Sequence, residues 1–204
     1  MRGPLGIARA AADAGATVVH YSTDFVHGGL DNPPDYLDEE VEAIPVNVYG
    51  HSKLMGEDAV MLASDQNYVL RTSWVIGERF LDIVRQKIDE GKFGLPPVGF
   101  ACPAIARDLV AATIRLLEDG APYGLYNAAN PPATDRPALS RALVEELGGD
   151  PDIVVVGEDT RPAPRPAHSP LAVEKLASVG IDMPPWRESL RSYLAGEPSP
   201  IFAG

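Results

Sequence analysis

Residues 17–77 contain two apolar runs with a helical pattern between them: TVVHYS at 17–22, VNVYGHSKLMGEDAVMLAS at 46–64 and YVLRTSWVIG at 68–77. Apolar runs rich in β-branched residues are typical of strands that are buried on both faces. In the middle segment, apolar residues recur at helical spacing, at positions 48, 55, 59 and 62. The stretch therefore predicts a strand, a helix and a strand, which is the repeating unit of an α/β fold with a mostly parallel sheet.

The same alternation continues on both sides of this stretch. An alanine-rich helix is expected at 5–14, because Gly15 follows it as a helix end. The pattern also predicts helices at 79–90, 105–119 and 137–148, strands at 124–129 and 152–157, and short helices at 171–180 and 185–196. The Gly- and Pro-rich residues 92–104 are expected to be irregular. We interpret the acidic segment 31–42 as a solvated surface or, alternatively, as a lid over a ligand.

Composition excludes several classes of protein. The 204 residues include 29 acidic and 17 basic side chains, so the net charge of −12 argues against a nucleic-acid partner. No run of 18 apolar residues is present, which predicts no membrane span. The single cysteine, Cys102, excludes an internal disulfide framework and indicates a reducing, cytoplasmic location. The four histidines lack the spacing of metal ligands, so no metal site is expected.

Tyr49 and Lys53 lie four residues apart in the predicted helix and therefore share one of its faces. The pKa of a phenol is normally about 10, and a nearby ammonium lowers it by favouring the phenolate. A tyrosine tuned in this way can donate a proton to a carbonyl oxygen as that carbonyl is reduced. Taken alone, the pair is also compatible with an ordinary contact on a helix surface.

Polar residues end both predicted strands. Ser22, Thr23 and Asp24 follow the first strand, and Arg71 to Trp74 lie at the end of the second. Ligands of doubly wound sheets bind beyond the C-terminal ends of the strands. A turn-forming Ser-Thr-Asp cluster and a core tryptophan are the structural alternatives.

Together these segments resemble the dTDP-4-dehydrorhamnose reductase family of extended short-chain dehydrogenases/reductases. The resemblance rests on seven segments in the family's order: STDFVHGG, PVNVYGHSKLMGE, VLRTSWVIGE, ARDLV, GLYNAAN, RPAHS and MPPWRESLRSYL. It covers nearly the whole chain and implies a partial Rossmann-type, doubly wound parallel sheet. Residues 1–90 would form the C-terminal half of an NAD(P)-binding domain. Residues 91–204 would form a smaller substrate-binding portion, with elements that return to the main sheet.

The resemblance implies reduction of a dTDP-4-keto-6-deoxysugar with hydride from NADPH or NADH. The expected catalytic residues are Thr23, which orients the carbonyl, Tyr49, which donates the proton, and Lys53. Tyr49, Lys53 and Ser22 are expected to contact the cofactor. Trp74 and Arg165 are expected to contact the nucleotide-sugar substrate. Arg165 and Arg161 either hold a diphosphate or are solvated loop arginines.

The sequence also departs from the family. No Gly-rich strand-turn-helix is present, which is the segment that binds a dinucleotide pyrophosphate. Phe25 and His27-Gly28 replace usual family residues, and Val98-Gly99 replaces a usual Asp-Gln pair, which leaves the sugar open. We expect either a fragment of a reductase or a short form that acts as a non-catalytic regulatory or scaffold subunit. A sheet without the first strands would expose an apolar edge and favour a homodimer or poor stability.

Overall fold

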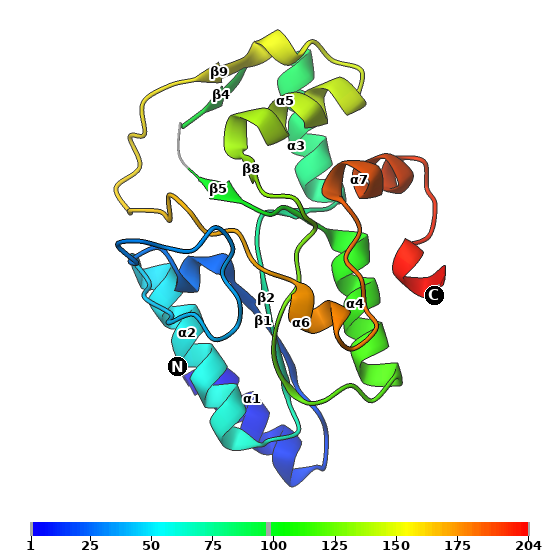
Figure 1. Ribbon diagram of the computed structural model, residues 1–204. Coiled ribbons are helices and arrows are strands. Elements are labelled where there is room, and N and C mark those ends of the chain that lie inside the picture. The colour runs from blue at the N-terminus through cyan, green and yellow to red at the C-terminus, as the bar shows by residue number, and fades with distance from the viewer. Residues whose placement is uncertain (1, 97–98, 204) are drawn as a thin grey trace.

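A computed structural model describes residues 2–96 and 99–203. Its main sheet is parallel and consists of β1 (Val19–Thr23), β2 (Tyr68–Thr72) and β7 (Gly124–Asn127), in the order β1-β2-β7 (Figure 1). Strand β2 lies in the middle, and all five of its residues are buried. The predicted α/β class with a parallel sheet is confirmed.

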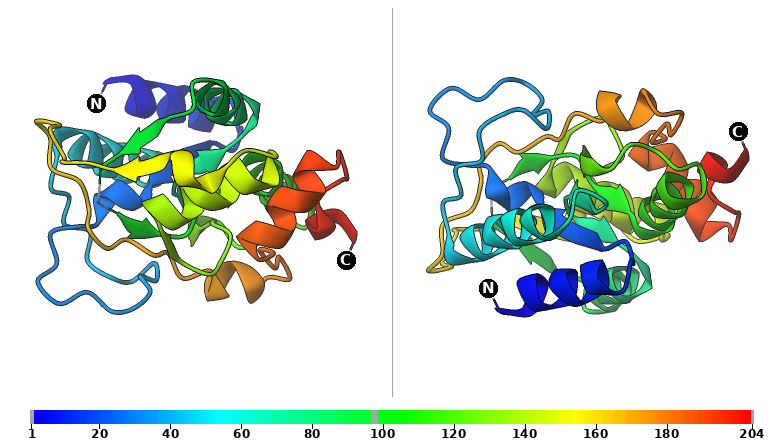
Figure 2. Two further views of the ribbon diagram at one scale, coloured as in Figure 1. Left: turned by 90° about the horizontal axis from the view of Figure 1, so that it is seen from above. Right: turned by 90° about the horizontal axis from the view of Figure 1, so that it is seen from below.

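Helices cover both faces of this sheet. Helices α1 (Arg2–Asp13) and α2 (Val48–Ala63) pack on one face, where Val69 of β2 contacts Ala8 and Val60. Helix α4 (Ala106–Glu118) covers the other face. Alternate residues of a strand point to opposite faces, so Tyr68 and Leu70 face α4 while Val69 faces α2. Figure 2 shows α1 and α2 together, away from the C-terminal end of the chain.

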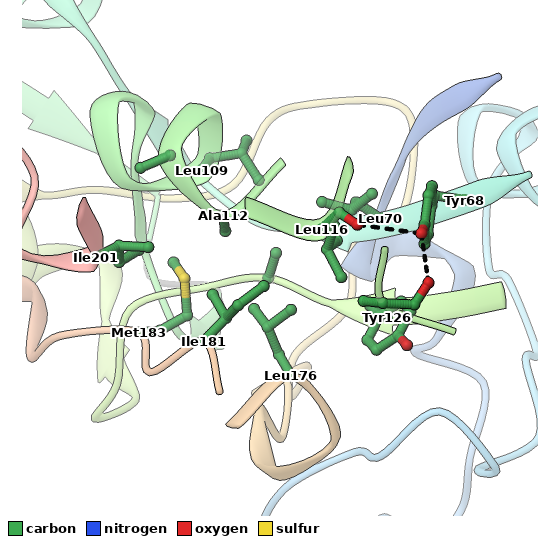
Figure 3. Packing of buried hydrophobic residues seen from close by; sticks show 13 residues of the cluster. Tyr68, Leu70, Leu109, Ala112, Leu116, Tyr126, Leu176, Ile181, Met183 and Ile201 are labelled. Carbon is green, nitrogen blue, oxygen red and sulfur yellow. Dashed lines mark hydrogen bonds between the residues drawn. The ribbon is translucent and has the colours of Figure 1, made fainter. Parts of the chain in front are cut away.

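The core beside α4 is the cluster drawn in Figure 3. Here the Tyr68 hydroxyl shares its single proton between the carbonyl oxygens of Ala121 and Leu116, at 2.5 and 3.1 Å. A buried phenol needs such acceptors because an unpaired hydroxyl costs free energy in an apolar environment. The bonds fix the C-terminal turn of α4 on the central strand.

A second group of strands lies beyond the main sheet, and only two of its members fall within strands predicted from the sequence, at 68–77 and 152–157. It consists of the ladders β3 (Val75–Ile76) with β6 (Ala104–Ile105), β4 (Phe93–Leu95) with β9 (Val154–Val156), and β5 (Phe100–Ala101) with β8 (Thr134–Asp135). Helices α3 (Glu78–Asp89) and α5 (Arg136–Glu146) pack beside them. The expectation that 92–104 is irregular is therefore wrong. These strands are too short for a periodic pattern, and pairing with distant segments creates them.

Two further expectations need correction. The strand predicted at 68–77 is broken, because Ser73 turns away to bond Asp24 and Val75–Ile76 pairs with β6 instead of β7. The helix predicted at 171–180 is reduced to α6 (Glu174–Ala177), because Leu171 pairs with Leu37 in a β-bridge. The second short helix is confirmed as α7 (Trp186–Leu194).

The acidic loop is attached to the body of the protein. Leu37 is fully buried, its N–H donates to the Pro170 carbonyl at 2.8 Å, and its own carbonyl accepts from Asn127 and Ala172. Glu39 accepts a bond from the Asn127 N–H at 2.7 Å. The middle of this loop is therefore anchored and is not the wholly solvated surface that its charge indicates.

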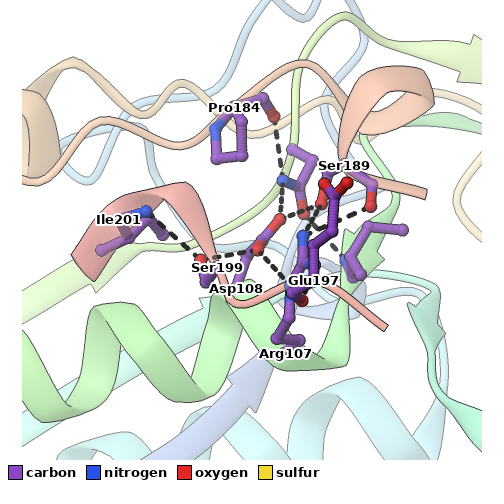
Figure 4. Close-up of polar contacts among 9 residues, drawn as sticks. Arg107, Asp108, Pro184, Ser189, Glu197, Ser199 and Ile201 are labelled. Atoms are coloured by element: carbon purple, nitrogen blue, oxygen red, sulfur yellow. Dashed lines mark hydrogen bonds and ion pairs between the residues drawn. The ribbon is translucent and has the colours of Figure 1, made fainter. Parts of the chain in front are cut away.

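The C-terminal segment is tied to α4 by the buried Asp108 (Figure 4). Its carboxylate accepts from the hydroxyls of Ser189 and Ser199 and from the amide of Asn130. Arg107 pairs with the same carboxylate and donates to the Glu197 carbonyl at 2.7 Å. A buried carboxylate is tolerated only when it is bonded in this way. None of the helices in the described ranges has the length and hydropathy of a membrane span.

Candidate active site

Helix α2 begins against the short turn that follows β1. The Asn47 side chain caps the helix by accepting the Gly50 N–H at 2.8 Å. A Cβ at Gly50 would lie 2.1 Å from the Phe25 carbonyl oxygen, so only glycine permits this close approach. The approach places Tyr49 against Phe25 in an edge-to-face contact with ring centroids 5.6 Å apart. Tyr49 stays about half exposed (52%).

Lys53 lies one turn further along the same face of α2. Its ammonium group donates to the Tyr21 carbonyl of β1, which fixes it at the edge of the sheet. Burial lowers the pKa of Lys53, and the Glu57 carboxylate opposes this by favouring the charged form. No hydrogen bond to the Tyr49 hydroxyl is found among the described residues, so this hydroxyl has no fixed protein partner there.

A buried polar network connects this face of α2 to the sheet. The Glu57 carboxylate pairs with the Arg71 guanidinium at 2.8 Å, and both side chains are almost fully buried. Ser22 donates its hydroxyl to the same carboxylate. His27 lies 3.4 Å from Arg71, and burial and the arginine charge lower its pKa to about 4, which keeps the ring neutral. The network joins α2 to the ends of β1 and β2.

Thr23 and Asp24 form a second network at the end of β1. The Thr23 hydroxyl accepts the Phe25 N–H at 3.2 Å and donates to the Asp24 carboxyl group at 3.1 Å. The other Asp24 oxygen accepts from Ser73 at 2.8 Å and Ser169 at 2.6 Å. Burial raises the pKa of Asp24 to about 6, although the three hydroxyl bonds favour its ionised form.

Two adjoining cavities open at this end of the sheet. The larger, of about 560 Å³, is lined by Tyr49, Phe25, Arg165 and neighbouring residues of α2 and the 163–165 segment. The smaller, of about 240 Å³, is lined by Trp74 and by three arginines, and it shares Phe25 and Arg165 with the first. The structure thus places Tyr49 and Trp74 at two adjoining cavities, and Arg165 lines both. Thr23, Lys53 and Ser22 are not among the residues that line either cavity.

The three arginines of the smaller cavity are Arg136, Arg161 and Arg165. The guanidinium of Arg136 lies 5.1 Å from the centre of the Trp74 ring and 5.6 Å from that of Phe80. Burial and the charges of Arg161 and Arg165 lower the pKa of Arg136. Arg161 pairs with Asp159, whereas no ion pair to Arg136 or Arg165 is found among the described residues. The cavity is therefore suited to an anion.

Sequence reasoning missed several of the buried residues around the site. Glu57 could have been found, because it lies one further turn along the face that carries Tyr49 and Lys53. Arg136 gave no signal, since it begins a helix more than 60 residues from Trp74. The described residues contain no cluster of three potential metal ligands. Val98 of the Val98-Gly99 departure lies outside the described residues. Gly99 packs against Trp74, and a Cβ there would lie 2.8 Å from the ring.

Comparison with known proteins places this chain in a family. Residues 1–197 match the family model described as the RmlD substrate binding domain. The chain belongs to the RmlD substrate binding domain family. It is 36% identical over 203 residues to the dTDP-4-dehydrorhamnose reductase of Mycolicibacterium smegmatis, covering 95% of this chain and 62% of that protein. The chain therefore spans less than two thirds of that relative's length.

Other relatives and solved structures show the same similarity. The Bacillus subtilis spore coat polysaccharide biosynthesis protein SpsK is 34% identical, over 88% of this chain and 64% of its own length. Among solved structures, the dTDP-4-dehydrorhamnose reductase of Bacillus anthracis in complex with NADP superposes with a TM-score of 0.86 at 25% identity. The Clostridium acetobutylicum enzyme gives 0.83 at 26%, and the chain covers 95% of itself and 70% of the solved chain in both comparisons. The predicted family and the partial Rossmann-type fold are thus confirmed.

Proposed function

We propose that this RmlD-family chain carries the proton-donating and substrate-binding residues for NAD(P)H-dependent reduction of a dTDP-4-keto-6-deoxysugar. One observation carries the proposal. The hydroxyl-bearing Tyr49 lines a cavity one helical turn from Lys53, and an arginine-lined cavity adjoins it. A ketone reductase that acts on a nucleotide sugar needs both a proton donor and an anion site.

The residues of α2 have distinct proposed roles. Tyr49 donates a proton to the carbonyl oxygen as it becomes an alcohol, and the ammonium of Lys53 stabilises the resulting phenolate. Thr23 orients the carbonyl through its hydroxyl. Tyr49, Lys53 and Ser22 contact the cofactor. NADPH or NADH supplies the hydride when bound. The half-exposed Tyr49, whose hydroxyl has no hydrogen-bond partner among the described residues, fits that arrangement.

On the substrate side, Trp74 and Arg165 contact the nucleotide sugar. Arg136 and Arg161 share the cavity with them, and paired guanidinium groups suit the oxygens of a diphosphate. The cavity combines an aromatic ring with guanidinium groups. This combination suits a ligand that has both a flat base and a charged diphosphate. The net charge of −12 over the whole chain makes this basic cavity selective for small anions over nucleic acid.

The proposed division of the chain follows the same roles. Residues 1–90 form the C-terminal half of an NAD(P)-binding domain, and residues 91–204 form the substrate-binding portion. Strand β7 crosses back from the second part to pair with β2. We also propose a cytoplasmic location, in keeping with the single, buried Cys102.

The test is the oxidation of NADPH by the purified chain in the presence of a dTDP-4-keto-6-deoxysugar. Tyr49→Phe is expected to lower kcat by about 100-fold or more, the usual contribution of a positioned general acid. Tyr123→Phe is the matched control, because that exposed tyrosine lines neither cavity. Binding of dTDP without NADPH binding or turnover would instead support the non-catalytic subunit.

A further inference from the structure

Asp24 lies at the junction of three segments that the proposed reaction uses. It follows Thr23 at the end of β1, and its carboxyl group accepts from Ser73 in the turn after β2 and from Ser169 in the segment that carries Arg165. Ser73 directly precedes Trp74 in the chain. The three donors are buried, and only 2% of Asp24 is exposed. Asp24 itself therefore cannot reach a substrate in this arrangement.

The hydrogen-bond count at Thr23 is the key observation. A hydroxyl group has one proton, and Thr23 donates it to Asp24 while it accepts the Phe25 N–H. Ser73 and Ser169 also donate their single protons to Asp24. An ionised carboxyl group can accept all three bonds. A protonated carboxyl group is itself a donor and a weaker acceptor, so these three bonds favour the ionised form.

We propose that Asp24 is a positioning residue that sets the direction of the Thr23 O–H and holds the Trp74 turn and the Arg165 segment against the end of β1. The proposal rests on the proposed function of Thr23. A Thr23 proton held by Asp24 keeps the hydroxyl oriented and close to the carbonyl site until a substrate oxygen competes for it. The same carboxyl group couples that hydroxyl to both substrate-contacting segments.

Among the described residues no cation pairs directly with Asp24, which is bonded by neutral hydroxyls and its own backbone N–H. Arg136 at the start of α5 is the charged group whose pKa responds to Asp24. Cys102 also senses it, but burial raises the pKa of that thiol to about 12, so it stays neutral. The pKa of Asp24 is consequently raised by burial and lowered by the three hydroxyl bonds and by a bond from its own backbone N–H.

The first test needs no turnover. Carbon NMR of the Asp24 carboxyl group in the full chain, assigned by its absence in Asp24→Asn, measures its titration midpoint. Thr23→Val, Ser73→Ala and Ser169→Ala are each expected to raise the midpoint, because each removes a donor that favours the ionised form. Ser140→Ala is the matched control, since this buried serine has no hydrogen-bond partner among the described residues. An unchanged midpoint in Thr23→Val or in Ser169→Ala overturns the proposal.

The second test separates positioning from general stability. Asp24→Asn is expected to lower kcat about tenfold in the wild-type background and less than about twofold in a Thr23→Val background, because coupled residues are not additive. An equal loss in both backgrounds overturns the proposal, even if the chain is an active reductase. If the wild type shows no turnover, the proposed function fails, and the titration still decides the role of Asp24.

Discussion

At the level of single residues, protonation of Asp24 makes the free energy of unfolding depend on pH. Its carboxyl group is almost fully buried, and its folded-state pKa of about 6 lies above the ordinary value of 3.8. The folded protein therefore binds this proton more tightly than the unfolded chain does. The resulting stability is fully present below about pH 4 and is lost as the pH rises through 6.

Asp24→Asn removes this dependence and keeps the shape of the side chain. We expect the free energy of unfolding of the variant, relative to the wild type, to rise by about 3 kcal/mol between about pH 4 and about pH 8. Urea unfolding over that pH range measures the difference. A difference that is constant with pH, or that falls, contradicts the raised pKa.

Glu57 provides a second prediction for a single residue. Glu57→Gln leaves the Arg71 guanidinium buried without its counter-charge, and the neutral His27 cannot replace it. We expect a loss of about 3–5 kcal/mol in the free energy of unfolding. Glu78→Gln removes one acceptor of the exposed Arg85 and should cost less than about 1 kcal/mol. Denaturant unfolding of both variants tests the contrast, and equal losses would be unexpected.

At the level of secondary-structure elements, the position of α2 depends on small residues. Gly50 lies against the Phe25 carbonyl, and Gly56 packs on the His20 ring. A side chain at either position would lift the helix that carries Tyr49 and Lys53 away from β1. By contrast, Gly6 of α1 has open space around it.

Two glycine-to-alanine variants test this difference. Gly50→Ala is expected to lower the free energy of unfolding by more than about 2 kcal/mol, through overpacking against the backbone. Gly6→Ala is expected to raise it by up to about 1 kcal/mol, because alanine is the better helix former. Thermal unfolding of the two variants beside the wild type measures both signs. A tolerated Gly50→Ala would show that α2 can shift without cost.

The elements themselves were predictable to different degrees. The strand at 19–23 follows from an apolar run rich in β-branched residues. The helix at 48–63 follows from its helical periodicity, and so does the placing of Tyr49 and Lys53 on one helix face. The break after Thr72 and the two-residue strands around 100–105 were missed. Their strand character comes from pairing with distant segments, such as Ala101 with Thr134, and no local periodicity records it.

At the level of the whole molecule, one side of β1 has no strand partner among the described residues. Among the described residues β1 pairs with β2 alone, and exposed strand edges favour pairing with another chain. We expect the purified chain to form a homodimer whose population grows with protein concentration. Sedimentation equilibrium over a wide concentration range tests this, and a monomeric mass at every concentration would contradict it.

The sequence by itself determined the α/β class, the family, and the helix on which a tyrosine and a lysine share one face, because these depend on contiguous residues. Only the tertiary structure brought Arg136 onto Trp74 and Ser169 onto Asp24, a pair 145 residues apart in the chain. Such contacts arise when separate elements bury their apolar faces together. Their buried polar groups must then be paired with whatever the packing brings near, and no local pattern specifies that partner.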